Sequence, residues 1–152
     1  MIKKVTRACD VETRVNYEKI TTFPFMVTRA AGSFGVDLVA LRGDVSFPVE
    51  VKASKTGVLR FSESSGRATQ QANDMLDECN RSKVVPIYAF RKKGVRGGDS
   101  WRVFTLEGAN PTGNMGLLYR RLPKIRMTKG AHYVMEWDQG MELNRFIEYL
   151  VI

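Results

Sequence analysis

Apolar residues recur along the chain in two kinds of pattern, one typical of helices and one of strands. Helical spacing predicts three helices, at residues 10–20, 67–82 and 141–150. Shorter apolar runs bounded by glycine, proline or polar residues predict six strands, at residues 23–28, 36–41, 47–53, 84–90, 101–106 and 131–137. This order of elements predicts an α/β fold with a mixed sheet flanked by helices, in a single domain spanning residues 1–152.

The remaining segments are expected to be loops. Residues 55–66 are polar and predicted to be mobile, residues 91–98 are basic and rich in glycine, and residues 111–116 read as a further loop. Asp10 is a plausible N-cap of the first helix. Cys79 falls on the apolar stripe of the second helix, which predicts a small core residue.

Composition narrows the class of protein. Lys and Arg number 24 against 16 Asp and Glu, a net charge of +8, which favours a polyanionic partner such as nucleic acid. Cys9 and Cys79 lie far apart, so neither a disulfide framework nor a zinc ribbon is expected. With no membrane-spanning stretch in the sequence, we expect a soluble intracellular protein.

Two carboxylates are predicted to meet in the hairpin formed by the second and third strands. If the turn consists of Gly43 and Asp44, counting outward places Asp37 opposite Glu50. Lys52 lies two residues further on and therefore shares the face of Glu50. A bulge at Pro48 would shift this register, so the facing pair is a hypothesis.

The surroundings of these carboxylates suggest a metal. Both strands are apolar on either side of Asp37 and Glu50, so two negative charges there would be poorly solvated and would repel each other. Lys52 offsets one charge at most. A hard divalent cation, Mg²⁺ or Mn²⁺, would offset the rest. The alternative is an ordinary charge cluster on a solvated surface.

The segment GVDLVA, which contains Asp37, followed by VEVK, which contains Glu50 and Lys52, resembles the D…ExK signature of the PD-(D/E)XK nucleases. Val36 stands where many members have proline, a departure that leaves the ligands unchanged. The order of other residues resembles one branch, the archaeal-type Holliday junction resolvases. Glu12, Arg29 and Ser33 match residues that precede its Asp.

Further positions extend the resemblance over most of the chain, and residues 107–129 have no counterpart in it. Gln71 matches a helical residue after the ExK strand. Arg91 and Trp101 follow where the branch has a basic and an aromatic residue, and Gly140 with the closing helix resembles its C-terminal end. The resemblance implies a PD-(D/E)XK nuclease-like mixed β-sheet flanked by helices.

The resemblance also implies roles. Glu12, Asp37 and Glu50, with the main-chain carbonyl of Val51, would hold Mg²⁺, and Lys52 would hold or deprotonate the attacking water or stabilise negative charge. Ser33 would donate to a phosphate. The alternatives are a solvated carboxylate for Glu12, a turn residue for Ser33 and a local hydrogen bond for Gln71.

Basic residues outside this group predict a broad DNA-binding surface that reads shape and backbone. The candidate contacts are Arg29, Ser33, Lys55, Arg60, Arg67, Gln71, Arg91, Lys92 and Lys93. A further basic group comprises Arg120, Arg121, Lys124, Arg126 and Lys129.

The expected activity is metal-dependent cleavage of four-way DNA junctions. Symmetric cuts on two strands would require a homodimer. Its candidate interface residues are Phe104, Leu106, Leu117, Leu118 and Tyr119, which the sequence does not separate from the core. Two alternatives stay open: another structure-specific or repair nuclease of the same fold, and a non-catalytic junction-binding module.

Overall fold

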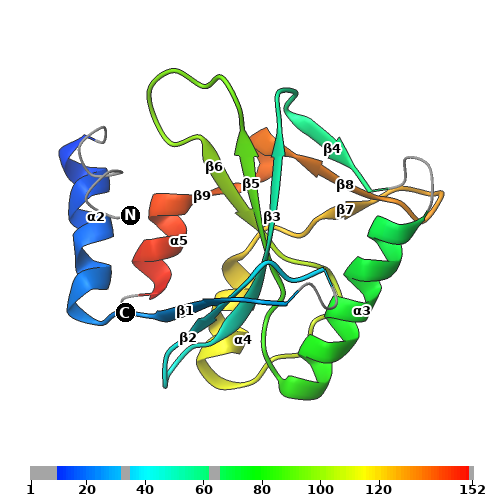
Figure 1. Ribbon diagram of the computed structural model, residues 1–152, viewed down its shortest axis with the longest axis horizontal. Helices are drawn as coiled ribbons and strands as arrows, with labels where there is room; N and C mark the ends of the chain where they lie inside the picture. The colour runs from blue at the N-terminus through cyan, green and yellow to red at the C-terminus, as the bar shows by residue number, and fades with distance from the viewer. Residues whose placement is uncertain (1–9, 32–34, 62–65, 151–152) are drawn as a thin grey trace.

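The computed structural model describes residues 10–31, 35–61 and 66–150 of the 152-residue chain. The helices are α2 (Val11–Thr22), α3 (Arg67–Ser82), α4 (Gly113–Arg121), α5 (Leu143–Leu150) and the short 3-10 helix η1 (Trp137–Gln139). The strands are β1 (Met26–Arg29), β2 (Leu38–Leu41), β3 (Phe47–Ser54), β4 (Val58–Arg60), β5 (Ile87–Lys92), β6 (Trp101–Phe104), β7 (Arg126–Met127), β8 (Tyr133–Glu136) and β9 (Met141–Glu142). Figure 1 shows their arrangement.

The strands form two sheets. The main sheet has six strands in the order β1-β2-β3-β5-β6-β9, and the small sheet has three in the order β4-β8-β7. All neighbouring strands are antiparallel except β3 and β5, which are parallel. The chain therefore has the mixed sheet with flanking helices that the sequence predicts.

Each face of the main sheet is covered by a different layer. On one face, Phe47 and Ile87 pack in a core with Leu118 of α4 and Phe146 of α5. On the other face, residues such as Tyr88 and Phe90 pack in a second core with α3 and the small sheet. Because successive residues of a strand point to opposite faces, β5 and β6 contribute to both cores.

The first helix begins where predicted, but it buries a different face. The Asp10 carboxylate accepts a hydrogen bond from the amide of Thr13 at 2.8 Å, as expected of an N-cap. The buried residues of α2 are Thr13, Asn16 and Tyr17, whereas Val11 and Val15 are exposed. α2 packs against α5 with the side that carries Thr13 and Asn16, so its two valines face the solvent.

The second predicted helix is confirmed over its full range, Arg67–Ser82. Its buried residues are Ala72, Met75 and Cys79. Burial raises the pKa of the Cys79 thiol to about 12. Cys79 is therefore a core residue, as the sequence predicts. No helix among the described residues has the length and apolar character needed to cross a membrane.

Two loop predictions are wrong. The segment 55–66 contains β4, which pairs with β8, and the segment 111–116 includes the start of α4 at Gly113. Met115 and Leu118 bury one side of α4, but two glycines and the nearby Pro111 hide the helical pattern in the sequence. β4 has three residues, too few for alternation to be distinctive.

The closing helix starts later than predicted because Met141–Glu142 pair with β6 as strand β9. Gly140, just before β9, lies very close to β6. A side chain there would place its Cβ 2.5 Å from the Cβ of Arg102 and 2.6 Å from the ring of Phe104. Glycine at this position is therefore required for the approach of β9 to the sheet.

Candidate active site

The β2–β3 hairpin has the register that the sequence predicts. Leu38 pairs with Val49, Val39 with Pro48 and Ala40 with Phe47. The amide of Val45 donates to the carbonyl of Arg42 at 3.2 Å across the turn. Pro48 therefore occupies a regular position. The pairing ends at Leu38, and the Asp37 side chain lies close enough to Glu50 to influence the pKa of its carboxyl.

Asp37 is held at the end of β2 by three hydrogen bonds. Its amide donates to the Val49 carbonyl and its carbonyl accepts from the amide of Ala30, both at 3.0 Å. The exposed Asp37 carboxylate accepts from the amide of Val51 at 2.7 Å. The carboxylate is thus tied directly to the strand that carries Glu50.

Glu50 and Lys52 point to the face of the sheet covered by α3. They pair with Tyr88 and Phe90 of β5, which belong to the second core. The Lys52 ammonium donates to Oε1 of Glu50 and forms an ion pair with it. The Glu50 side chain is 11% exposed and the Lys52 side chain 27% exposed, so the pair extends from the buried interior toward the surface.

The electrostatic environment of Glu50 makes its charged form less stable than it is in water. Burial is the main cause and raises the pKa of the Glu50 carboxyl, an effect to which the nearby Asp37 carboxylate adds. The hydrogen bond and charge of Lys52 act in the opposite direction without cancelling the rise. A cation between the two carboxylates would stabilise the charged form of both.

The main-chain carbonyl of Val51 also faces this region. The Val51 amide points toward Asp37, and the amide and carbonyl of one strand residue point to the same edge of the strand. The carbonyl is therefore directed away from β5, toward the end of β2. Asp37, Glu50 and Val51 supply oxygen atoms of the kind that Mg²⁺ prefers.

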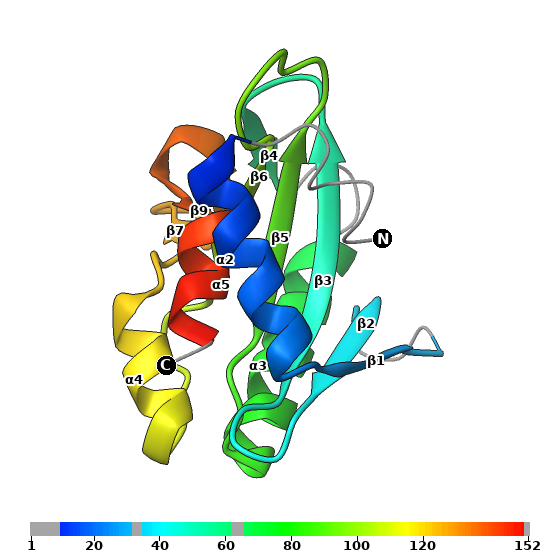
Figure 2. The same ribbon diagram turned by 90° about the vertical axis from the view of Figure 1, so that its left-hand side faces the viewer.

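Glu12 does not lie with this group. It is an exposed residue in the first turn of α2. α2 packs against α5, and the core residues of α5 lie on the face of the main sheet opposite Glu50 (Figure 2). Within residues 10–31, 35–61 and 66–150, no group of three or more His, Cys, Asp or Glu side chains is close enough to hold a metal.

Two further predicted residues lie near Asp37. Arg29 is exposed at the end of β1 and pairs with Leu38, the residue after Asp37. Gln71 of α3 packs against Gly35, which has a φ of +70° and whose added Cβ would lie 3.1 Å from the Cβ of Gln71. Both residues thus border the turn into Asp37. Ser33 lies outside the described residues.

The predicted DNA contacts fall into separate places. Lys55, Lys92 and Lys93 gather where the parallel strands β3 and β5 end, and the Lys93 amide donates to the Ser54 carbonyl at 2.7 Å. The β5–β6 loop projects beyond the sheet at this end (Figure 1). The other exposed predicted contacts are Arg60 in β4, Arg67 at the start of α3 and Arg91 in β5.

Trp137 organises this end of the sheet, a role that the sequence does not reveal. Its ring lies under the Lys92 ammonium, 5.1 Å from the centroid, and under the Arg102 guanidinium, at 3.8 Å. Its indole nitrogen donates to the Ser100 carbonyl at 3.0 Å, and its amide to the Gly57 carbonyl at 2.7 Å. Trp137 therefore links the β3–β4 loop, through Gly57, with the β5–β6 loop, through Ser100, and Lys92 lies over its ring.

Part of the last basic group is engaged within the protein. The Lys124 ammonium donates to the carbonyls of Tyr119 and Leu122 at 2.6 and 2.7 Å, and burial lowers its pKa. Arg126 pairs with Glu136 at 2.6 Å. These two cations are consequently less available to DNA than their charge suggests.

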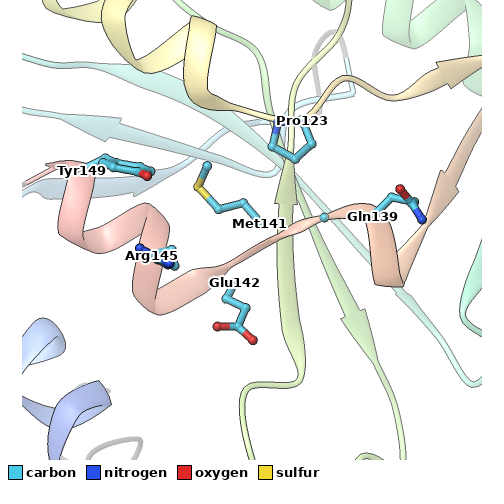
Figure 3. A pocket seen from close by; sticks show the side chains of 7 residues that line it. Pro123, Gln139, Met141, Glu142, Arg145 and Tyr149 are labelled. Carbon is cyan, nitrogen blue, oxygen red and sulfur yellow. The ribbon is translucent and has the colours of Figure 1, made fainter.

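A depression of about 420 Å³ lies elsewhere on the surface (Figure 3). Its lining residues are Pro123, Gln139, Gly140, Met141, Glu142, Arg145 and Tyr149. Glu142 pairs with Arg102 at 3.5 Å, and none of the predicted site residues lines the depression. The candidate active site is therefore the open end of β2 and β3.

Comparison with known proteins identifies the fold. The chain is similar in structure to Hjc from Archaeoglobus fulgidus, a Holliday junction resolvase from an archaeal hyperthermophile, with a TM-score of 0.55. The match covers 91% of this chain and 97% of Hjc, at 16% sequence identity. No family description matches the sequence, and no curated protein does. The predicted mixed sheet flanked by helices is thus confirmed, and it is arranged as in Hjc.

Proposed function

We propose that this protein is a metal-dependent endodeoxyribonuclease that resolves four-way DNA junctions. The observation that carries the proposal is the placement of Asp37, Glu50 and Lys52 at one end of the β2–β3 hairpin. The Hjc-like fold supports the substrate class, since Hjc is a Holliday junction resolvase.

The donor set of the site fits Mg²⁺. Two carboxylates and one carbonyl are hard oxygen donors, and Mg²⁺ in phosphoryl-transfer sites is held through one or two carboxylates together with substrate phosphates. Asp37, Glu50 and Val51 would hold the ion, and Mn²⁺ would substitute for it. For Glu12 the only support for a ligand role is the resemblance. Its helix α2 lies on the opposite face of the sheet.

The chemistry is hydrolysis of a phosphodiester. The oxygen of a water forms a bond to phosphorus, the bond from phosphorus to the leaving sugar oxygen breaks, and that oxygen takes up a proton. A bound Mg²⁺ would polarise the phosphate and lower the pKa of the water. Lys52, fixed by its bond to Glu50, would stabilise the negative charge that develops on the phosphate.

DNA would be held mainly through its phosphates. Arg29 lies beside Asp37 and offers a bidentate phosphate contact close to the cut. The more distant proposed contacts are Ser33, Lys55, Arg60, Arg67, Gln71, Arg91, Lys92 and Lys93. Two symmetric cuts would require a two-fold homodimer, with one active site in each copy.

The test is cleavage of an immobile four-way junction with Mg²⁺, beside a linear duplex and a single strand of the same sequence. The proposal expects paired symmetric nicks in the junction and little cutting of the controls. Equal cleavage of all three substrates would instead indicate a less selective nuclease. Junction binding without cleavage in Mg²⁺ or Mn²⁺ would indicate a non-catalytic binding module.

A further inference from the structure

Exposed apolar side chains gather near the start of the described chain. Eight large hydrophobic residues are exposed among the described residues, and five of them lie in α2, β1 and the connection between them. These five are Val11, Val15, Phe23, Met26 and Val27. We call this set the N-terminal apolar surface. Such a concentration is typical of a surface that binds another protein.

Strand β1 is the most open part of this surface. It is the outermost strand of the main sheet, and all four of its residues are exposed. Met26 and Val27 are 65% and 57% exposed and, being adjacent, point to opposite faces. β1 and β2 extend away from the helical layer (Figure 2). Apolar residues on both faces, such as Met26 and Val27 here, are more typical of strands that lie inside a sheet.

The interface residues predicted from the sequence do not provide an alternative surface. Phe104, Leu106 and Leu118 are at most 4% exposed and belong to the two cores, so they are wrong as interface candidates. Tyr119 is half-buried against the first core. Leu117 is 53% exposed.

The charge on the N-terminal apolar surface favours a second copy of the same chain. The protein as a whole carries +8, so two copies repel each other over most of their surfaces. Residues 10–29, which span the N-cap, α2 and the whole of β1, contain three acids and three bases, a net charge of zero: Asp10, Glu12 and Glu18 against Arg14, Lys19 and Arg29. This segment is therefore neutral within a strongly basic protein and allows close approach without repulsion.

We propose that β1 pairs with β1 of a second copy in antiparallel orientation, so that the two main sheets join into one. An open edge strand is a ready template for such pairing, and an antiparallel pair of identical strands has two-fold symmetry. The outward residues of α2, above all Val15, would flank the contact. This interface rests on the proposed function in one respect: cutting two strands of a junction requires two active sites.

The geometry of this pairing has a consequence for cleavage. The two-fold axis of an antiparallel pair is perpendicular to the sheet, so Glu50 and Lys52 of both copies would face the same side. β3 is the third strand from the joined edge. Five inter-strand steps would thus separate the two copies of β3, which is about 24 Å. Both sites would be presented together to one DNA molecule.

The test compares charge substitutions on β1 with a matched one elsewhere. Met26→Lys and Val27→Lys place a charge on the contact, and Leu117→Lys places one on α4 at a similarly exposed residue. Light scattering after size exclusion gives the mass. We expect wild type and Leu117→Lys at twice 17.2 kDa and both β1 variants at 17.2 kDa. Circular dichroism checks that each variant is folded.

Three outcomes would overturn the interface: a monomeric wild type, β1 variants that stay dimeric, or dissociation of Leu117→Lys as well. Junction cleavage is scored on the same samples and answers a separate question. Monomeric β1 variants that still nick the junction, but on one strand at a time, support the interface and the nuclease together. If no sample cleaves but the β1 variants dissociate, the interface stands and the proposed function fails.

Discussion

The Val51 amide donates to the Asp37 carboxylate at 2.7 Å, which joins the two strands of the candidate site. β2 no longer pairs with β3 at this point, so the side chain takes the bond that a backbone carbonyl would otherwise accept. Val51 lies between Glu50 and Lys52, and one hydrogen bond therefore sets the position of Asp37 relative to both.

Replacing Asp37→Asn should abolish cleavage while the protein stays folded. Asparagine keeps an oxygen for the Val51 amide but removes the charge that would hold the metal. A loss of several kcal/mol in transition-state stabilisation corresponds to a rate reduction of about 10³-fold or more. Single-turnover cleavage of a junction measures the rate.

Junction affinity of Asp37→Asn in the absence of metal is the control and should be close to wild type. Mg²⁺ should raise the melting temperature of wild type more than that of the variant, since binding to the folded state alone stabilises it. Substantial cleavage by the variant, or an equal Mg²⁺ shift in both proteins, would count against Asp37 as a ligand.

Replacing Lys52→Met should impair both cleavage and folding stability. The nearly buried Glu50 carboxylate would lose its partner, at a cost of about 1–3 kcal/mol in the free energy of unfolding. Loss of the stabilising charge should lower the cleavage rate by about 10²–10³-fold. Urea denaturation and cleavage kinetics measure the two effects.

A second substitution separates these effects. In the double variant Glu50→Gln/Lys52→Met the unpaired charge is absent, so stability should return toward wild type while cleavage stays lost. If the single Lys52→Met variant were as stable as wild type, the ion pair would have no structural importance.

Arg42 should be important for stability at a distance from the site. Its buried guanidinium donates to Asp44 and to the carbonyls of Phe23 and Leu150, and lies over the rings of Phe23 and Phe25. It thus joins the hairpin turn, the α2–β1 connection and the end of α5. We expect Arg42→Met to cost about 2–4 kcal/mol in urea denaturation, more than Arg81→Met on the exposed end of α3.

The Arg42–Asp44 pair should also make stability depend on pH. The hydrogen bond from Arg42 lowers the pKa of the Asp44 carboxyl. A lowered folded-state pKa gives stability that is present above the unfolded value of about 3.9 and is lost as the pH falls through the folded value. Asp44→Asn should therefore be less stable than wild type by about 1 kcal/mol at neutral pH, since Asp44 is partly exposed. The difference should shrink toward zero as the pH falls below the folded-state value, and a constant difference would contradict this account.

DNA binding should depend on the lysines where β3 and β5 end. Lys93→Ala should weaken junction binding and reduce the slope of log affinity against log salt by about 1, because one phosphate contact is lost. Arg81→Ala removes the same charge at the far end of α3 and should leave the slope unchanged. Fluorescence anisotropy over a salt series measures both slopes. A Lys93→Ala slope equal to that of Arg81→Ala would mean that Lys93 makes no phosphate contact.

The features that the sequence determined by itself are local. A two-residue turn and the alternation of strand residues were sufficient to predict the pairing of β2 with β3, and with it the approach of Asp37 to Glu50. The period of apolar residues was sufficient for the full range of α3. Each of these depends on interactions between residues close in the chain, for which spacing is a direct measure.

Only the tertiary structure decided how distant elements meet. The docking of α2 on α5 buries Thr13 and Asn16, exposes Val11 and Val15, and keeps Glu12 away from Glu50. The pattern of α2 indicates a helix but not its partner, since burial depends on the surface that each element finds. For the same reason, the open edge of β1 could be recognised only once the order of the strands was known.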